Sequence, residues 1–268
     1  MPRRARLDAE LVRRGLARSR EHASQLIGAG RVTVRGTVAS KPATAVEPDA
    51  PLTVTEGDDP GWASRGAHKL LGALAAFETL TVQGKRCLDA GASTGGFTDV
   101  LLRAGARAVV AADVGRGLLD WRLRTDPRVV TLDRTNVRTL TPEQTGGPVE
   151  LIVADLSFIS LRLVLPALLA CTTPDADLLP MIKPQFEVGK DRLGSGGVVR
   201  DPGLRAEAVL EVLSSAAQRG LRVLGVTASP LPGPAGNVEY FAWLRCGEPL
   251  GHEDMAAMVD QAVREGPQ

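Results

Sequence analysis

The pattern of apolar positions changes period repeatedly from residue 64 onward. Short apolar runs rich in Val, Ile and Leu alternate with longer segments in which apolar residues recur every three or four positions. The short runs predict buried strands, and the longer segments predict amphipathic helices. The predicted strands are 86–91, 108–114, 128–133, 151–157 and 178–184, and the predicted helices are 64–77, 95–106, 117–123 and 161–171.

The C-terminal part of this pattern ends in a hairpin. A helix is predicted from Pro202, behind the capping residue Asp201, to Arg219. Two further strand-like runs, 222–229 and 239–245, are separated by a nine-residue loop. The predicted fold class is therefore α/β, a doubly wound sheet that is mostly parallel and has a terminal antiparallel hairpin. Ligands of such sheets bind at the carboxyl ends of the strands.

Residues 6–54 form a second, smaller pattern. Two short amphipathic stretches predict a pair of helices, the second capped by Ser19, and three apolar runs predict short strands. A tight turn is expected at Arg35-Gly36, between the first two strands. These segments are the helices 7–16 and 19–30 and the strands 31–34, 37–42 and 52–54. They predict a small α+β unit in front of the larger sheet.

The segment EGDDPGW separates the two patterns. It is acidic and contains Gly and Pro without periodicity, which is typical of a linker. We therefore predict a first domain over 1–59, a linker over 60–63 and a second domain over 64–268, whose first helix is capped by Ser64. Trp62 is expected to make an apolar contact between the two domains, and stacking on a nucleic-acid base is the alternative.

The cysteines and the hydropathy restrict the class of protein. Cys87, Cys171 and Cys246 are far apart and form no CxxC pair, so neither a disulfide framework nor a zinc site is predicted. This usage fits a reduced, cytoplasmic location, and we expect no bound metal. The sequence has no apolar run of about 18 residues for a membrane span, and the first residues lack the apolar core of a signal peptide. We therefore expect no membrane partner.

The net charge is only +1, but the charge is unevenly distributed. The first 46 residues hold nine Arg and one Lys against three acidic residues. Such a local excess is typical of a surface that binds nucleic acid. Arginine is abundant throughout, with 27 Arg to 5 Lys, so a solvated helix face is the alternative for any single arginine. The candidates for nucleic-acid contact are Arg4, Arg6, Arg18, Arg20, Arg35 and Lys41.

A glycine-rich turn, GASTGG, follows the first predicted strand of the larger sheet. It lacks the GxGxxG spacing of a dinucleotide loop, and Asp89 just before it would repel a pyrophosphate. A carboxylate there suits a cation, and S-adenosylmethionine carries a sulfonium and an ammonium group. Asp113, at the end of the next strand, can accept both ribose hydroxyls of such a donor. The alternative is a helix-entry turn that holds no ligand. The predicted donor contacts are Asp89, Gly91, Ala92, Ser93, Gly95, Asp113, Val114, Asn136 and Asp155.

The methyl acceptor is indicated by the end of the strand at 151–157. Its DLSF ending lacks the Pro-Pro-aromatic signature of amine methylation, and no nearby nucleophilic cysteine points to base-carbon methylation. A ribose hydroxyl must lose a proton as its oxygen attacks, so it needs a base or a cation. Lysine can serve as either, whereas arginine cannot be deprotonated. Lys69 and Lys183 therefore stand out in this arginine-rich chain, together with Asp155 and Glu239.

These stretches resemble known families. Residues 6–54 resemble the S4 RNA-binding domain in the spacing of LD, SR, LI and KP. The set Lys69, Asp155, Lys183 and Glu239 resembles the tetrad of the FtsJ-type ribose methyltransferases. Nearly the full chain resembles the TlyA family of ribosomal RNA 2′-O-methyltransferases, through SRGAHKL, LDAGASTGGFTDVLL, VADLSFIS, KPQFEVGK and SPLPGPAGNVEYF.

The resemblance implies a Rossmann-like methyltransferase domain behind an S4-like RNA-binding domain. It implies S-adenosylmethionine as cofactor and methylation of cytidine 2′-hydroxyls in ribosomal RNA, 16S and/or 23S. Lys183 is then the base, while Lys69, Asp155 and Glu239 orient the ribose. The expected partners are ribosomal RNA and ribosomal subunits, and the expected state is a monomer or weak dimer.

Two other classes of protein remain open. A non-catalytic S4-type ribosome assembly factor would keep the RNA-binding unit and lose donor binding, which calorimetry with S-adenosylmethionine would detect. A haemolysin-like, membrane-active protein is the second class, because TlyA-like proteins also carry that name. Liposome leakage would test it.

Overall fold

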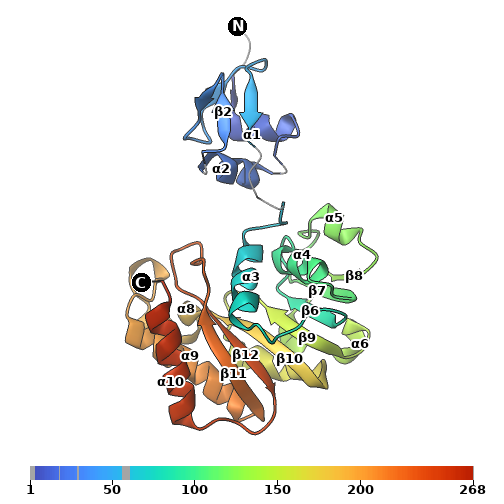
Figure 1. Cartoon of the computed structure of the whole chain (residues 1–268), viewed down its shortest axis with the longest axis vertical. Helices are drawn as coiled ribbons and strands as arrows, with labels where there is room; N and C mark the ends of the chain where they lie inside the picture. The colour runs from blue at the N-terminus through green and yellow to red at the C-terminus, as the bar shows by residue number, and fades with distance from the viewer. Residues whose placement is uncertain (1–3, 18, 29, 56–60, 268) are drawn as a thin grey trace. The chain divides into compact units, whose positions relative to one another are not determined.

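The computed structural model describes residues 4–17, 19–28, 30–55 and 61–267 (Figure 1). The chain divides into two compact units, Met1–Gly61 and Trp62–Gln268. The predicted boundary after residue 59 lies outside the described residues, so the domain limits 1–59 and 64–268 stay a prediction.

The N-terminal unit is a small α+β structure, as predicted. Its core contains Leu7 and Leu11 from the first helix, Ile27 from the second and Val32 from the central strand. Three strands pair in the order β3-β2-β5, and β1 pairs separately with β4. The elements are β1 (Ala5–Arg6), α1 (Leu7–Arg13), α2 (Arg20–Gly28), β2 (Val32–Val34), β3 (Thr37–Val38), β4 (Ala45–Val46) and β5 (Leu52–Val54).

Two local predictions in this unit are confirmed. The Ser19 side chain accepts a hydrogen bond from the His22 amide at 3.1 Å, so it caps α2. Arg35 and Gly36 both have positive φ, 51° and 81°, which forms the tight turn between β2 and β3. The β1–β4 pair was not predicted, because strands of two residues are too short to show a period.

The C-terminal unit contains a seven-stranded sheet with the order β11-β12-β10-β9-β6-β7-β8. Neighbouring strands are parallel except for β12, which runs antiparallel to both β10 and β11. The predicted doubly wound sheet with a terminal hairpin is therefore confirmed. The strands are β6 (Arg86–Ala90), β7 (Ala108–Ala112), β8 (Val129–Leu132), β9 (Val149–Ala154), β10 (Thr172–Ile182), β11 (Leu221–Ala228) and β12 (Tyr240–Cys246).

Helices follow the strands in regular alternation along the chain (Figure 1). They are α3 (Gly66–Ala76), α4 (Gly96–Arg103), α5 (Trp121–Arg124), α6 (Pro142–Thr145), α7 (Leu161–Ala170), α8 (Pro184–Glu187), α9 (Pro202–Ala217) and α10 (His252–Glu265), with single 3₁₀ turns at Val137–Thr139, Lys190–Arg192 and Ser195–Gly197.

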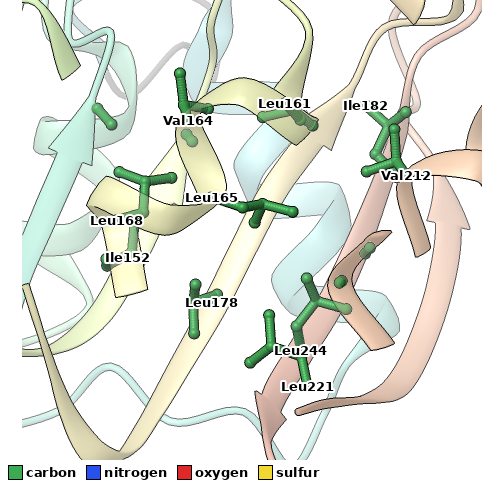
Figure 2. Packing of buried hydrophobic residues seen from close by; sticks show 14 of the residues in the cluster. Ile152, Leu161, Val164, Leu165, Leu168, Leu178, Ile182, Val212, Leu221 and Leu244 are labelled. Atoms are coloured by element: carbon green, nitrogen blue, oxygen red, sulfur yellow. The ribbon is translucent and has the colours of Figure 1, made fainter. Parts of the chain in front are cut away.

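Each central strand contributes alternate residues to two separate cores. On one face of the sheet, Leu88 and Ile152 pack with residues of α7, α9 and α10, and Figure 2 shows part of this core. On the other face, Cys87 and Leu151 pack with residues of α3 and α4. Burial of both faces explains why the strands read as continuous apolar runs in the sequence.

Three local predictions need correction. Helix α3 begins at Gly66 with Arg65 as its cap residue, and the Ser64 side chain accepts from the Gly66 amide at 3.2 Å. Helix α9 ends at Ala217, two residues before the predicted Arg219. The C-terminal helix α10 was not predicted, although its buried residues Met255, Val259, Ala262 and Val263 recur at helical spacing.

Trp62 packs against the core of the C-terminal unit. The guanidinium of Arg103 lies 4.2 Å from the centre of its indole ring, a cation–π contact. The next residue is tied to the same helix, because the Ala63 amide donates to Asp99 Oδ2 at 2.9 Å. Residues 62 and 63 thus belong structurally to the C-terminal unit, while the expected contact of Trp62 with the other domain stays a prediction.

Candidate functional site

The structure brings Lys69, Asp155, Lys183 and Glu239 together at one edge of the sheet. Asp155 directly follows β9 and Lys183 directly follows β10, so both lie at the carboxyl ends of neighbouring parallel strands. Glu239 directly precedes β12, which runs antiparallel to β10 and therefore starts at the same edge. Lys69 reaches this edge from α3, outside the sheet.

The four side chains form one connected network. Lys69 Nζ donates to Glu239 Oε2 at 2.5 Å, and Lys183 Nζ lies 2.6 Å from Asp155 Oδ1. Glu239 links the two pairs, because its Oε1 lies 4.0 Å from Lys183 Nζ. Lys183 also donates to Ser157 Oγ at 3.0 Å. Two ammonium groups and two carboxylates thus balance in charge within one small site.

Burial differs sharply within this network. Glu239 is only 1% exposed, and both lysines are buried, whereas the Asp155 side chain is partly open to solvent. Buried charges are tolerated only when they are paired and hydrogen-bonded. Each lysine here has a carboxylate partner, so the buried network is compatible with a stable fold. The network is therefore most open to solvent at Asp155.

A glycine makes room for Glu239. A Cβ placed on Gly233, in the loop between β11 and β12, would lie 2.6 Å from Glu239 Oε1. A side chain at this position would push the carboxylate away from both lysines. The loop is also anchored from the side, since Asn237 accepts from the Val199 amide at 2.9 Å and donates to the Gly197 carbonyl at 3.0 Å. Sequence reasoning did not single out Gly233, although it lies in a quoted motif.

The glycine-rich turn that contains Gly91, Ala92, Ser93 and Gly95 connects β6 to α4, next to Asp155. Gly91 has a φ of 87°, and a Cβ there would overlap the main-chain carbonyl of Asp155. Only glycine allows this approach of the two loops. The turn and the lysine network are therefore parts of one edge of the sheet.

Asp113 fixes the glycine-rich turn from the neighbouring strand. Its two carboxylate oxygens accept from the Ser93 amide at 2.8 Å and from the Gly115 amide at 2.7 Å. The next residue, Val114, is exposed. Asn136 lies farther along the edge, after β8, where its side chain accepts from the Arg138 amide at 3.0 Å. The structure thus joins Asp113 directly to the turn, whereas Asn136 makes its described contact only within its own 3₁₀ turn.

Asp89 is fully buried behind this turn. Thr98 Oγ1 donates to its Oδ2 at 2.7 Å, but Oδ1 has no hydrogen-bond partner among the described residues. Burial is the main cause that raises the pKa of Asp89 to about 7; the nearby carboxylates of Asp155 and Asp113 act in the same direction, and the hydrogen bonds from Thr98 oppose them. An unpaired buried carboxyl close to two other acids is a place where a cation is favourable. The donor set therefore fits S-adenosylmethionine, whose ammonium and sulfonium groups are both positive.

Sequence reasoning missed one aromatic side chain at the site. Phe158, three residues after Asp155, is 90% exposed and has a positive φ of 63°. Its ring is 5.1 Å from that of Phe186, which lies in α8 close behind Lys183. A largely exposed aromatic ring in an uncommon backbone conformation is typical of a binding role. The available signal was the Phe of VADLSFIS, which was quoted but given no role.

The basic residues predicted to contact RNA lie in the N-terminal unit, and most of them are exposed and paired. Asp8 bonds to both Arg6 and Arg20, and Glu47 bonds to both Arg4 and Arg35. The Lys41 side chain has no partner among the described residues. Arg18 lies outside the described residues.

In the part of the chain that the structure describes, no helix has the length and apolarity needed to cross a membrane. The same residues contain no cluster of three His, Cys, Asp or Glu side chains that could hold a metal ion.

The fold and the site together define a class of enzyme, and comparison with known families agrees with it. A family model described as FtsJ-like methyltransferase matches residues 62–246, and a model of the S4 domain matches residues 5–51. The first match covers the glycine-rich turn and all four residues of the lysine–carboxylate network. The C-terminal unit is thus of the FtsJ-like methyltransferase class.

Several relatives are similar over most of their length. The 16S/23S rRNA (cytidine-2′-O)-methyltransferase TlyA of Mycobacterium tuberculosis is 61% identical over 269 residues, which covers 100% of both chains. Hemolysin A of Brachyspira hyodysenteriae is 35% identical over 88% of this chain and 98% of its own. A solved structure from Streptococcus thermophilus, described as a candidate hemolysin, has a TM-score of 0.76 at 35% identity and covers 99% of this chain and 98% of its own.

The chain belongs to the TlyA family of rRNA cytidine-2′-O-methyltransferases, which use S-adenosylmethionine as the methyl donor.

Proposed function

We propose that this protein methylates the 2′-hydroxyl of cytidine in 16S and/or 23S ribosomal RNA. The observation that carries the proposal is the network of Lys69, Glu239, Lys183 and Asp155 beside the glycine-rich turn. The similarity of the chain over its full length to the Mycobacterium tuberculosis enzyme supports the choice of substrate. We further propose that the protein acts on ribosomal subunits as a monomer or weak dimer, without a metal.

The donor would be held by residues at the ends of four neighbouring strands. Asp113 and Val114 are placed to bind its nucleoside part, and Asn136 lies farther along the same edge. Asp89 would supply a negative charge to the donor's cationic part, and the Gly91–Gly95 turn, with Ala92 and Ser93, would line the donor site. Asp155 borders this turn. When bound, S-adenosylmethionine supplies an electrophilic methyl group on a positively charged sulfur.

The protein's own residues then prepare the acceptor. The 2′-oxygen would form a bond to the methyl carbon as the carbon–sulfur bond breaks and leaves a neutral thioether. The neutral amine form of Lys183, which must first release its ammonium proton to solvent, would accept the proton of the 2′-hydroxyl at Nζ. Asp155 and Ser157 hold that nitrogen in place, 2.6 and 3.0 Å away. Glu239 lies between the two lysines, and its charge is balanced by Lys69. Fixed placement of the nitrogen matters because a proton transfer needs hydrogen-bond distance at the moment of attack.

Phe158 has the properties required to hold the base of the target nucleotide. Its ring is exposed, next to Ser157, and is supported from behind by Phe186. Bases of unpaired nucleotides stack on aromatic rings at about 1–3 kcal/mol each. We propose that the target cytosine stacks on Phe158 while its ribose faces Lys183.

The test is nucleoside mapping by mass spectrometry. Purified 16S and 23S rRNA or intact subunits are incubated with S-adenosylmethionine and either the wild-type protein or Lys183→Ala. We expect 2′-O-methylcytidine with the wild type and none with the variant. Methylation of a base, or of another ribose, would contradict the proposal. Binding of rRNA without donor binding and without any methylated product would favour the non-catalytic assembly factor.

A further inference from the structure

Two of the exposed arginines in the N-terminal unit are held by one buried carboxylate. Asp8, the second residue of α1, is only 3% exposed. Arg6 binds it at two points, with Nε 3.1 Å from Oδ1 and Nη2 2.9 Å from Oδ2. Arg20, the first residue of α2, donates to the same Oδ2 at 3.0 Å. The Ala9 amide completes the set at 2.8 Å from Oδ1.

The carboxylate fixes the relative position of the two guanidinium groups. Both Nη2 atoms bond to a single oxygen, so they lie within about 6 Å of each other. Hydrogen bonding to Arg6 is the main cause that lowers the pKa of Asp8 to about 2, so the carboxylate is charged at neutral pH. Asp8 thereby joins segments on three elements, β1, α1 and α2.

The outer sides of both arginines stay free for a ligand. Arg6 is 52% exposed and Arg20 is 60% exposed at the side chain. A guanidinium has five N–H donors, and Arg6 uses only Nε and Nη2 on Asp8, which leaves Nη1 available. Two guanidinium groups against one carboxylate leave a net positive charge. An anion with several acceptor oxygens therefore fits this position.

We propose that Asp8 is the positioning residue that holds Arg6 and Arg20, two of the arginines predicted to contact RNA, at the spacing that lets both bind one phosphate group of the ribosomal RNA backbone. The inference rests on the proposed function, which supplies the RNA. A phosphate matches the planar donor groups of arginine better than it matches a single ammonium. Preorganised arginines lose less side-chain entropy on binding than free ones. The contact positions the RNA without reading its sequence.

The direction in which RNA affinity changes distinguishes a positioning role of Asp8 from the effect of its charge alone. Removing a negative charge from an RNA-binding surface raises affinity if charge alone matters. If Asp8 positions the arginines, Asp8→Asn lowers affinity although the surface becomes more positive. The two explanations therefore predict opposite changes.

Helix α1 also provides a matched control. Glu10 is as buried as Asp8 and pairs with Arg13 at 2.6 Å and with Arg14 at 2.7 Å. Its pKa is likewise lowered to about 2, chiefly by hydrogen bonds from these two arginines. However, Arg14 donates to the carbonyls of Ala50 and Pro48, so this pair holds the unit together and does not form a second outward pair. Glu10→Gln removes the same charge from the same helix.

The experiment measures binding of a labelled rRNA fragment to the full-length protein over a series of salt concentrations. We expect Asp8→Asn to weaken binding about five- to tenfold and to reduce the slope of log K against log salt by about one. Glu10→Gln should bind as tightly as the wild type or more tightly. Unchanged or tighter binding by Asp8→Asn, with the fold intact by circular dichroism, would overturn the inference.

A second pair of variants answers the case in which Asp8→Asn does not fold. Arg20→Lys and Arg13→Lys both keep their charge, and the side chains they replace are similarly exposed, 60% and 62%. Only Arg20→Lys should weaken rRNA binding, because only this change removes a planar guanidinium group from the proposed site. Equal binding by the two variants would also overturn the inference. Failure of the proposed function looks different, since the wild type itself would then leave rRNA unmethylated.

Discussion

The ammonium group of Lys183 has polar contacts on several sides, whereas Lys69 has one partner among the described residues. Asp155, Ser157 and Glu239 surround Lys183 Nζ at 2.6, 3.0 and 4.0 Å. Position at a strand end made Lys183, Asp155 and Glu239 predictable from the sequence. Their pairing was not predictable, because it depends on how α3 packs against the sheet and brings Lys69 to Glu239. Ser157 was missed for the same reason, since a serine in a loop carries no periodic signal.

Lys183→Arg separates a proton acceptor from a fixed positive charge. Arginine keeps the charge but cannot take up the proton, so we expect methyl transfer to stop almost completely while S-adenosylmethionine and rRNA still bind. Lys69→Arg is the control, because Lys69 contacts only Glu239 in the network and should tolerate the change better. The measurement is single-turnover methylation of a saturating rRNA fragment. A Lys183→Arg rate within about tenfold of the wild type, ~1.4 kcal/mol of barrier, would exclude the base role.

Asp89 predicts a pH-dependent affinity for the donor. Its pKa of about 7 means that the carboxyl is protonated at lower pH and must lose this proton when a cation binds beside it. Between about pH 5.5 and 7, each unit of pH increase should therefore strengthen donor binding by up to about tenfold, and the rise should level off above pH 7. Calorimetry in buffers of different ionisation enthalpy would detect the released proton.

The Asp89 prediction has two control variants. Asp89→Asn should bind the donor more weakly and show no proton release between pH 5.5 and 7 beyond that of the donor alone. Asp113→Ala should lose about 1–3 kcal/mol of donor affinity at every pH, while the pH dependence remains. A wild-type affinity that is flat across this range would rule out Asp89 as the charge that balances the donor.

At the scale of elements, Lys183 and the short helix α8 that follows it support the loop after β9. Lys183 bonds to Asp155 and Ser157, and Phe186 packs on Phe158. Beyond these, Glu187 accepts from Ser160 Oγ at 2.6 Å and from the Leu161 amide at 2.8 Å, at the start of α7. The alternating pattern predicted the long strands and helices well, because both faces of the sheet are buried. A four-residue helix such as α8 shows no period, so its supporting role became visible only in three dimensions.

Glu187 should therefore affect both the free energy of unfolding and the loop that follows β9. Glu187→Ala leaves the buried Leu161 amide without its acceptor, and we expect a loss of about 1–3 kcal/mol in the free energy of unfolding. Glu187→Gln keeps an oxygen for that amide and should lose less. Urea unfolding followed by circular dichroism gives both values. Equal stability of Glu187→Ala and the wild type would show that α8 does not anchor α7.

At the scale of the whole molecule, the chain joins an RNA-binding unit to a methyltransferase unit, each with its own core. The change in pattern near residue 56 was sufficient to predict two units. It could not show to which unit Trp62 and Ala63 belong, because they contact Arg103 and Asp99, which are distant in sequence. These contacts indicate that a stable methyltransferase unit starts at Trp62.

Truncated chains test the division of labour between the units and the role of residues 62 and 63. A chain of residues 62–268 should bind S-adenosylmethionine but fail to methylate rRNA, because the arginines that hold the RNA are gone.

A chain of residues 64–268 lacks the indole on Arg103 and the amide on Asp99, which should cost about 1–2 kcal/mol of stability. Its melting temperature should lie a few degrees lower, roughly 2–6 °C for a unit of this size. Equal melting temperatures would remove residues 62 and 63 from the folded unit. Normal rRNA methylation by either truncated chain would show that the N-terminal unit is not needed to place the substrate.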